Sequence, residues 1–513
     1  MSAGPAAAAA ARRNGHRWLL LGCCLGLGIT ALDVTVVNVA LPTLSRSLHT
    51  DLTGLQWVID AYMLALASLL VLAGSLGDRL GRRMMLRAGL IGFGVASAAC
   101  SLAPSVTWLV IFRVIQGTAA ALLVPNALST LTNVITDSAE RARALGVWSA
   151  VFGISAAAGP ICGGLLVQGI GWRSIFWINV PVVLLTLGLI SRYAPETRAP
   201  QARRLDLPGQ ALILAATSAA IGALIEAPSL GWTAPATLAL FVLAAALLAA
   251  FIAAERRARQ PLIDLRFFAS PLFSGAASIA VLSFAIYSGL LLLSTLYLQE
   301  VRGASPVQAG LELIPSLGTM TFVSPIVGRV MAVRGHRAML AISGLLLAGG
   351  TTVLALAPPG CSYGLLALAY ALIGLGLATV NPPITHVAVS GMPTEQAGVA
   401  SAIASSTRQL GNAFGVAVLG SLLSSLLAAR LVTLADHPGL LAGTRRALLA
   451  AAREGGQLHA GAPAGAHALF AGAFVASAHV AWWLATGFGV AITAIALATG
   501  WPRLGRSPAR AAS

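Results

Sequence analysis

The sequence contains no lysine and few charged residues of either sign. Charged side chains make up 9% of the 513 residues, and hydrophobic side chains make up 57%. So few polar side chains cannot cover a soluble particle of this length, and the chain therefore belongs in a lipid bilayer. Because all 32 basic residues are arginine, a phosphate-binding loop of the G-x-x-x-x-G-K type is excluded. A nucleotide-driven motor in this chain is excluded with it.

Cysteine and histidine are also scarce, and neither has the spacing of a reactive or metal-binding site. The chain has five cysteines, four of them inside apolar runs, where they suit small packing residues better than a disulfide or metal set. The apolar runs contain neither a Ser/His/Asp set nor a cluster of histidines. The catalytic residues that an intramembrane enzyme would need are therefore missing. We predict a protein that is not an enzyme and that needs no metal or cofactor.

The formal charge of +16 would usually suggest a nucleic-acid partner. The arginines, however, fall in short clusters between apolar runs rather than along one amphipathic face. Membrane topology produces this distribution. We therefore predict a lipid bilayer around the protein and no nucleic acid as a partner.

Apolar runs of about twenty residues recur along the whole chain. The first run could instead be a signal peptide, but it is too long for one and contains Asp33. We predict an all-α integral membrane protein with fourteen spans. They are 18–41, 55–76, 84–103, 107–130, 144–168, 174–192, 208–227, 234–254, 271–298, 306–331, 338–357, 363–388, 397–427 and 468–500.

The arginines also indicate the orientation of these spans. An even number of spans puts both termini on one side, and the loops of that side carry most of the arginines, as at 79–87 and 256–259. Arginine-rich loops stay in the cytoplasm. We predict that both termini are cytoplasmic, in the cell membrane, and that 428–467 is an external, partly helical segment without chemistry.

The stretch 74–83, G-S-L-G-D-R-L-G-R-R, concentrates acid, arginine and glycine between two apolar runs. Charges are costly in hydrocarbon, and glycines allow a tight turn with close backbone approach. We predict a short charged loop between two helices, with an ordinary solvated loop as the alternative. The residues that we expect to matter are Gly74, Asp78, Arg79, Gly81 and Arg82.

A degraded copy of this stretch occurs at 325–337, P-I-V-G-R-V-M-A-V-R-G-H-R, where the acid is missing. Such an internal echo is typical of transporters that are built from two repeats. We predict two six-helix halves, 1–200 and 271–513. The region 201–270 between them then holds two inserted linker helices.

Four ionisable residues lie inside apolar runs at a similar depth. Counted at about 1.5 Å per residue, Asp33, Asp60, Arg113 and Glu312 lie about 8–12 Å from the outer ends of their helices. An ionisable group in a membrane helix is costly unless it faces a wet cavity or a partner. We predict a common cavity in the outer half, where these groups exchange protons or bind substrate. The alternative is a set of structural ion pairs or caps that never titrate.

Two arginines near mid-span are accompanied by amide side chains. Arg113 shares a helix face with Gln116, so that guanidinium and amide point into the same space. Arg408 lies with Gln409 and Asn412 and forms the polar patch of the second half. We predict that both arginines act at the site. The alternative for Arg408 is that it neutralises the carbonyl groups of a neighbouring helix.

The fifth span contains the order G-P-x-x-G-G at 159–164. Small residues on one helix face let another helix approach closely, and a proline removes one backbone hydrogen bond and permits a bend. Glycine-rich packing is common in membrane helices, which is the alternative reading. The residues concerned are Gly159, Pro160, Gly163 and Gly164.

Seven stretches together resemble one family over nearly the whole chain. They resemble the fourteen-span drug/proton antiporter branch of the major facilitator superfamily, the multidrug efflux permeases. The stretches are L-D-V-T-V-V-N-V-A-L-P (32–42), W-V-I-D-A-Y-M-L (57–64), the 74–83 stretch, R-V-I-Q-G-T (113–118), G-P-I-C-G-G (159–164), G-W-R-S-I-F-W-I-N-V-P (171–181) and A-G-V-A-S-A-I-A-S-S-T-R-Q-L-G (397–411).

The resemblance implies a major-facilitator fold and the export of small hydrophobic or cationic compounds in exchange for entering protons. It implies that Asp33 and Asp60 bind protons or cationic substrate and that Arg113 couples to them. Glu312 is not part of the family pattern, and the copy at 325–337 lacks the acid that a second gate needs. The resemblance further assigns a cytoplasmic latch to Asp78, Arg79 and Arg82, and a hinge or leak seal to Gly159 and Pro160.

Two other functions remain open on the same fold. A proton-coupled transporter of a nutrient or metabolite shares the architecture, although the G-P-x-x-G-G helix and fourteen spans favour an antiporter. A non-transporting membrane sensor would be expected to have lost Asp33 or Arg113. The partners that we predict are a small-molecule substrate, protons and the bilayer, with the chain acting as a monomer. The identity of the substrate stays open.

Overall fold

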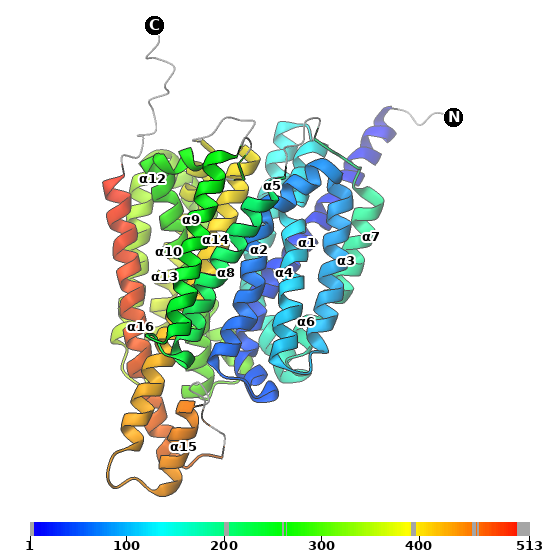
Figure 1. Cartoon of the computed structure of the whole chain (residues 1–513). Helices are drawn as coiled ribbons and strands as arrows, with labels where there is room; N and C mark the ends of the chain where they lie inside the picture. The colour runs from blue at the N-terminus through cyan, green and yellow to red at the C-terminus, as the bar shows by residue number, and fades with distance from the viewer. Residues whose placement is uncertain are drawn as a thin grey trace.

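The structure is a computed structural model that describes residues 5–199, 205–258, 261–262, 264–390, 397–453, 458 and 461–499. Within these ranges all regular elements are helices. Fourteen of the segments are long and apolar enough to cross a membrane, which confirms the predicted all-α membrane fold. Figure 1 shows these helices aligned side by side as one bundle, with both termini at the same end.

Seven helices precede the inserted pair. The four-residue α6 and the longer α7 together form one span, Ser174–Tyr193. The elements are α1 (Pro5–Leu48), α2 (Leu52–Leu80), α3 (Arg82–Ser101), α4 (Val106–Val134), α5 (Ser138–Gly169), α6 (Ser174–Trp177) and α7 (Asn179–Tyr193).

The inserted pair and the second group of helices follow. The π-helical turn η2 continues α10 directly, and α11 leads into α12. The elements are α8 (Leu207–Leu230), α9 (Pro235–Arg257), the 3-10 helix η1 (Leu265–Ala269), α10 (Pro271–Leu296), η2 (Tyr297–Val301), α11 (Pro306–Glu312), α12 (Ile314–Leu356), α13 (Tyr363–Ser390), α14 (Ala397–Ala435), α15 (Ala442–Arg453) and α16 (Ala464–Ala498).

Several helices start at a residue that caps their free N–H groups. Asp51 accepts from the N–H of Gly54 at the start of α2, and Asp137 accepts from that of Glu140 at the start of α5. Ser305 forms a capping box with Gln308 at the start of α11. Each cap satisfies a backbone donor that the helix itself cannot pair, which fixes where the helix begins.

The predicted loop at 74–83 is a break of one residue rather than a loop. Helix α2 continues to Leu80 and α3 begins at Arg82, so that Gly81 alone is non-helical, with φ 122°. The echo at 325–337 behaves in the same way, because α12 runs through it and is interrupted at Gly335, with φ 81°. Glycine adopts these positive φ angles without strain, so one glycine replaces the loop that we expected at each place.

A helical extension projects from the end opposite the termini. Helices α14 and α16 span 39 and 35 residues, more than the twenty or so that a membrane requires. They continue beyond the bundle and carry α15, as Figure 1 shows. Leu448 and Ala451 of α15 are buried. Following the predicted topology, we call this end the outer end and the end with the termini the inner end.

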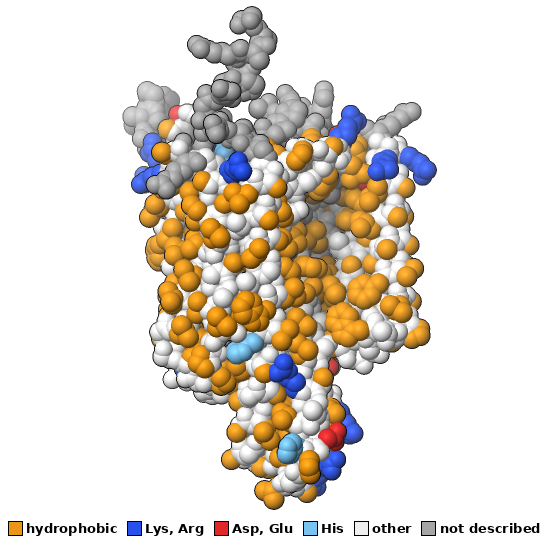
Figure 2. All heavy atoms as spheres, turned by 90° about the vertical axis from the view of Figure 1, so that its left-hand side faces the viewer, with side chains coloured by type: hydrophobic (Ala, Val, Ile, Leu, Met, Phe, Trp, Pro, Cys, Tyr) orange, Lys and Arg blue, Asp and Glu red, His pale blue; other side chains and the backbone are white. Residues whose placement is uncertain are grey.

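Figure 2 shows many hydrophobic side chains across the visible face of the bundle. Arginines gather at the inner end and on the projecting extension, and the visible surface between them is mostly hydrophobic. Contacts group α1–α7 on one side and α10–α16 on the other; α2 and α14 pack directly against each other, and α8 contacts both. The limits of the two halves at residues 200 and 270 stay a prediction.

Candidate functional site

Asp33 of α1 and Arg113 of α4 form an ion pair in the interior of the first group of helices. Both are buried, with exposed fractions of 0% and 1%. A buried ion pair is compatible with folding only when the remaining lone pairs and N–H groups also find partners. The neighbouring polar side chains supply these partners.

Two amides complete the coordination of the Asp33 carboxylate. Gln116 Nε2 and Asn179 Nδ2 donate to Oδ1 over 2.9 and 3.1 Å, while Arg113 donates to Oδ2. Ser97 Oγ accepts from the same two amides over 3.2 and 2.9 Å. The carboxylate is therefore held at both oxygens, by side chains from α4 and α7.

The Arg113 guanidinium is fixed as tightly as its partner. Its Nε donates to Val58 O over 3.0 Å, and its Nη1 donates to Gln116 Oε1 over 2.8 Å. The group also lies over the ring of Tyr62, 4.1 Å from the ring centroid. Cation–π contact stabilises a positive charge where water is excluded. Helix α2 therefore joins the cluster through a carbonyl group and an aromatic ring.

The structure brings Asp33, Arg113 and Gln116 together, and it adds two residues that we had not singled out. Asn179 and Ser97 are both buried between the helices. In the sequence each is one uncharged polar residue in an apolar run, a pattern that also fits ordinary helix packing. Asn179 could have been found from the sequence, because a buried amide in a membrane helix needs a hydrogen-bond partner.

Asp60 of α2 was predicted at a depth in the membrane similar to that of Asp33 and Arg113. It takes no part in the hydrogen bonds of their cluster. It is 0% exposed, and neither carboxylate oxygen has a partner among the described residues. It stands one helical turn after Gln56, which bonds α14, so that both lie on the same side of α2. An unpaired ionised carboxylate costs several kcal/mol in such a place, and a bound proton removes that cost.

Glu312 stays outside the Asp33–Arg113 cluster, although we expected a cavity that all four ionisable groups share. It ends α11 at the break before α12, and Tyr363 Oη donates to its backbone O over 3.4 Å. None of the described hydrogen bonds of Asp33 or Arg113 involves it. Its Oε2 is buried and has no hydrogen-bond partner within the described ranges. Equal depth did not place Glu312 beside α4.

Arg408 belongs to a separate polar group on α13 and α14. Its Nη2 donates to Ser405 Oγ over 3.0 Å, and its Nη1 donates to Asn381 Oδ1 over 3.5 Å. Nearby, Asn412 Nδ2 donates to Gln409 Oε1 over 2.8 Å. The structure thus places the predicted residues of the second half on one stretch of α14, in two separate sets of hydrogen bonds. Neither set joins the Asp33 cluster through any hydrogen bond of the described residues.

The 74–83 stretch is held by the segment that follows α7. Arg82 donates to Asp78 Oδ1 through Nη2 over 2.7 Å and Nε over 3.2 Å. Backbone bonds then tie both residues to the segment, from Arg82 N to Thr197 O and from Ala199 N to Asp78 O, each over 3.0 Å. We call this contact between the α2–α3 break and the segment after α7 the inner clasp.

Glu196 closes the same clasp and was absent from our sequence-based set. Its Oε1 accepts from Arg83 N over 3.1 Å. A Cβ at Gly81 would lie 2.6 Å from Glu196 Cδ, and the φ of 122° at this position would strain any residue other than glycine. Gly74 faces Pro125, 3.7 Å from where its own Cβ would lie. Arg79 is exposed, and no described ion pair involves it.

The glycines of the fifth span bring α5 against α1. A Cβ at Gly159 would collide with Thr35, and a Cβ at Gly163 would lie 2.9 Å from Val36 Cγ2 and 3.0 Å from Val36 O. A side chain at either glycine would therefore force α1 and α5 apart. The two glycines allow this close helix crossing, two to three residues from Asp33.

The same span meets α11 of the second group on its other side. A Cβ at Gly164 would lie 2.6 Å from Pro306 O and 2.7 Å from Val307 Cα. In return, a Cβ at Gly310 would collide with the backbone carbonyl of Pro160. Helix α5 is thus clamped between α1 and α11, and its G-P-x-x-G-G order forms one of the contacts between the two groups, beside that of α2 with α14.

Two glutamine amides seal the outer end between the groups. Gln56 of α2 donates to Val416 O over 2.8 Å, and Gln299 of the π turn donates to Val39 O over 2.9 Å. An ion pair of 2.8 Å joins Arg46 of α1 to Glu300 beside them. Together with the α5–α11 contact, these bonds describe a conformation that is closed at the outer end.

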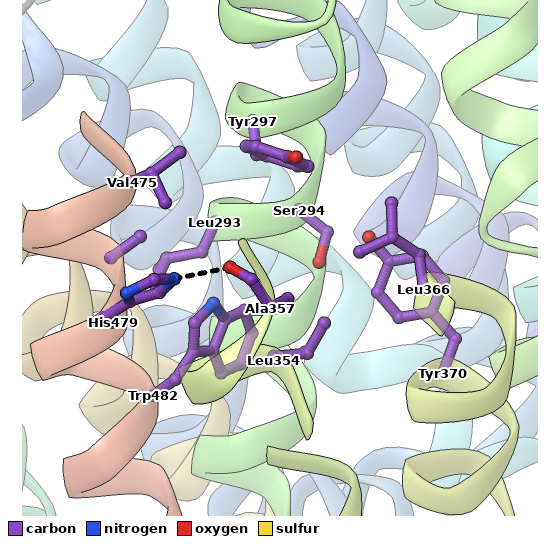
Figure 3. A pocket seen from close by; sticks show the side chains of 11 residues that line it. Leu293, Ser294, Tyr297, Leu354, Ala357, Leu366, Tyr370, Val475, His479 and Trp482 are labelled. Atoms are coloured by element: carbon purple, nitrogen blue, oxygen red, sulfur yellow. Dashed lines mark hydrogen bonds between the residues drawn. The ribbon is translucent and has the colours of Figure 1, made fainter. Parts of the chain in front are cut away.

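A small cavity lies within the second group of helices, and Figure 3 shows its aromatic lining. Tyr297, Tyr370 and Trp482 surround it, and His479 is fixed by a 2.9 Å hydrogen bond to Ala357 O. Its volume of about 30 Å³ has room for one or two water molecules rather than for a drug-sized ligand. The cavity is therefore not the substrate site in this conformation.

Metal binding has no support in the part of the chain that the structure describes, where no group of three or more His, Cys, Asp or Glu side chains converges. The five cysteines are free. The chemistry available in the Asp33 cluster is that of one carboxylate, one guanidinium and two amides. Such a set is chemically suited to hold a proton or an organic cation.

Comparison with known families gives one match across most of the chain. The model described as Major Facilitator Superfamily matches residues 23–416. The chain is 39% identical over 413 residues to the multidrug resistance protein Stp of Mycobacterium tuberculosis, covering 80% of this chain and 76% of that protein. It is 40% identical over 417 residues to the tetracenomycin C resistance and export protein of Streptomyces glaucescens, covering 80% and 77%.

Other relatives and solved structures extend this comparison. The methylenomycin A resistance protein of Streptomyces coelicolor is 38% identical over 405 residues, covering 78% of this chain and 84% of that protein. A bacterial homologue of the human lysosomal transporter Spinster, inward-facing and occupied, has a TM-score of 0.67 at 16% identity, with 94% and 96% coverage. A D-xylose-proton symporter has a TM-score of 0.61 at 14% identity, with 95% and 98% coverage. At these identities the solved structures show the fold alone.

Proposed function

The chain belongs to the Major Facilitator Superfamily of membrane transporters, and from this premise we propose that it exports drugs or antibiotics in exchange for protons. Relatives that are 38–40% identical are named for drug or antibiotic resistance, and one of them also for export. This supports small hydrophobic or cationic compounds as substrates. We propose that it works as a monomer in the cell membrane, with both termini in the cytoplasm.

The observation that carries proton exchange is the contrast between two buried carboxylates. Asp33 is fully coordinated by Arg113 and two amides, whereas Asp60 has no partner among the described residues. We assign the exchanged proton to Asp60, because a proton is the smallest partner that removes an unpaired buried charge. A cationic substrate group can neutralise the same carboxylate. Proton and substrate then compete for one site, which is the requirement for exchange.

The Asp33 cluster is assigned the coupling between occupancy and helix packing. Asp33 lies on α1 beside the glycine crossing with α5, and α5 contacts α11 at the outer seal. A change in charge near Arg113 that shifts α1 therefore also shifts α5, and α5 contacts α11 of the second group. The inner clasp of Asp78, Arg82 and Glu196 keeps α2 and α3 in one body while the seal opens. Alternating access needs such a two-state element, biased by its ligands.

We expect Asp60→Asn to uncouple transport from protons without unfolding the protein. Asparagine keeps the shape of the side chain and cannot exchange a proton, and no described hydrogen bond is lost. In vesicles with an imposed pH gradient, the variant should lose gradient-driven accumulation of a cationic dye by more than tenfold. Its detergent-solubilised melting temperature should stay within a few degrees of that of the unmodified chain.

Asp436→Asn is the control for this prediction, because Asp436 is an exposed acid of the projecting extension that the proposed mechanism does not use. Its coupled transport should resemble that of the unmodified chain. If Asp60→Asn moves protons and dye in the original ratio, the assignment of the exchanged proton to Asp60 is wrong. Screening a drug-sensitive host that expresses the chain for raised minimum inhibitory concentrations tests the export of drugs itself.

A further inference from the structure

The inserted helix pair α8–α9 lies over the seam between the two groups of helices. Helix α8 packs against α2 of the first group and α14 of the second, and α9 packs on α8. In Figure 1 the pair runs along the bundle in front of α14 and α2. A hairpin in this place contacts both bodies that move relative to each other in alternating access.

Three residues of α8 contact two residues of α2, Ser68 and Trp57. Gln210 donates to the carbonyl of Ser68, and Thr217 lies within 3.5 Å of the Ser68 hydroxyl. Near the outer end, Trp57 Nε1 donates to Glu226 Oε1 over 2.8 Å. These attachments cover sixteen residues of α8, about 24 Å of helix. A helix held along such a length moves with α2 as one body.

The close fit around Trp57 supports the same conclusion. Gly222 faces its indole ring, and a Cβ there would lie 3.3 Å from Cη2 and Cζ2. The absence of a side chain lets the ring lie flat against α8 and reach Glu226 one turn later.

Helix α8 packs against α14 as extensively as against α2, but among the described residues the hairpin's side-chain hydrogen bonding to α14 is limited to the outer end. Trp232, in the turn between α8 and α9, donates through Nε1 to Ser425 Oγ over 3.0 Å. This hydrogen bond joins the hairpin to the second group. Ser425 follows the stretch of α14 that Gln56 contacts in the outer seal. The bond therefore closes only when the outer end is closed.

We propose that the α8–α9 hairpin is a strap that moves with α2 and stabilises the outward-closed conformation through the Trp232–Ser425 bond. Trp57 and Glu226 are its positioning residues, and Trp232 is the residue that releases when the outer end opens. The inference rests on alternating access, as the proposed function does, but not on protons or on the class of substrate. It gives the two extra helices a part in the conformational cycle.

The test measures the distance across the outer end in the full chain in lipid nanodiscs. Spin labels are placed at Leu102→Cys, in the loop after α3, and at Ser362→Cys, in the loop before α13. Both positions are exposed, Leu102 by 69%. The native cysteines are buried or half-buried, and a sample without the added cysteines gives their background. Electron–electron double resonance then reports the ratio of open to closed outer ends.

Trp232→Phe keeps an aromatic ring and removes the N–H donor, and Ser425→Ala removes the acceptor. Each should raise the open-to-closed ratio by about two- to tenfold, the effect of one net hydrogen bond. The double variant should add nothing further, because both changes remove the same bond. Trp57→Phe should act in the same direction by loosening the strap from α2.

Trp483→Phe is the matched control, because its indole is exposed and none of the described hydrogen bonds uses it. It should leave the distances unchanged. If the spin-label distances in Trp232→Phe and Ser425→Ala equal those of this control, the proposal that the hairpin acts as a strap is wrong. Because no substrate or pH gradient is used, a chain that shows the shift but exports nothing contradicts the proposed function alone. A chain that exports drugs without the shift contradicts the strap alone.

Discussion

Asp33→Asn is expected to abolish drug efflux and to destabilise the folded protein by about 3–5 kcal/mol, since it leaves the Arg113 guanidinium buried without its counter-charge. Arg113 is 1% exposed, so water cannot replace the lost carboxylate. Gln116 and Asn179 would also face a neutral amide instead of a charged acceptor. Efflux of a dye driven by a pH gradient and the melting temperature of the purified chain measure the two effects.

A double variant separates structure from function at this pair. In Asp33→Leu with Arg113→Met, no unpaired charge remains, and replacing a buried pair by apolar side chains is often neutral for stability. We expect the double variant to melt close to the unmodified chain, well above either single variant, and still to show no efflux. Efflux in the double variant would contradict a functional role for the pair and leave it a structural one.

Gly164→Ala is expected to reduce efflux by more than tenfold, because its Cβ has no room at the contact with α11. The new atom would lie 2.6 Å from Pro306 O and 2.7 Å from Val307 Cα. Backbone atoms cannot move aside as a flexible side chain can, and overpacking of this kind costs about 1–3 kcal/mol. The outer seal would then close less often, which the spin-label distance across the outer end measures directly.

Gly146→Ala on the same helix is the control for this prediction. A Cβ at Gly146 meets nothing within 4 Å, and alanine favours a helix over glycine. It should leave both efflux and distances unchanged. Equal behaviour of Gly164→Ala and Gly146→Ala would show that the α5–α11 contact is not part of the seal.

The fold could be predicted from the sequence because membrane spans are long and apolar. The fourteen spans were found at nearly their observed positions, since no other structure satisfies the backbone in lipid. The prediction of loops at 74–83 and 325–337 was wrong for a local reason. Glycine and arginine clusters are typical of loops, yet one glycine with positive φ breaks a helix without adding any loop residues, as Gly81 and Gly335 show.

The candidate site could be predicted only in part. Charged residues in apolar runs attract attention, which is why Asp33, Arg113 and Gln116 were found and the polar Ser97 and Asn179 were not. Counting residues along a helix gives the depth of a side chain. It does not give the direction in which the side chain points or the helix that lies beside it. Asp60 and Glu312 show this, because the hydrogen bonds of the cluster include neither.

The extra helices illustrate a second limit of the sequence. Their apolar runs indicated that 201–270 crosses the membrane twice, but not which helices the pair packs against. The attachments through Trp57, Glu226 and Trp232 depend on the partner that each side chain meets in the folded chain. Such long-range pairs leave no periodic pattern within either helix.

The central claim is that the chain exchanges an exported compound for protons through a buried carboxylate site. The most direct test reconstitutes the full chain in lipid vesicles with an acidic interior and records a cationic dye and the internal pH together. We predict that the dye accumulates inside while the interior becomes more alkaline, and that Asp60→Asn vesicles and protein-free vesicles show neither change. Dye accumulation without any movement of protons, or at the same rate without the gradient, would contradict the account.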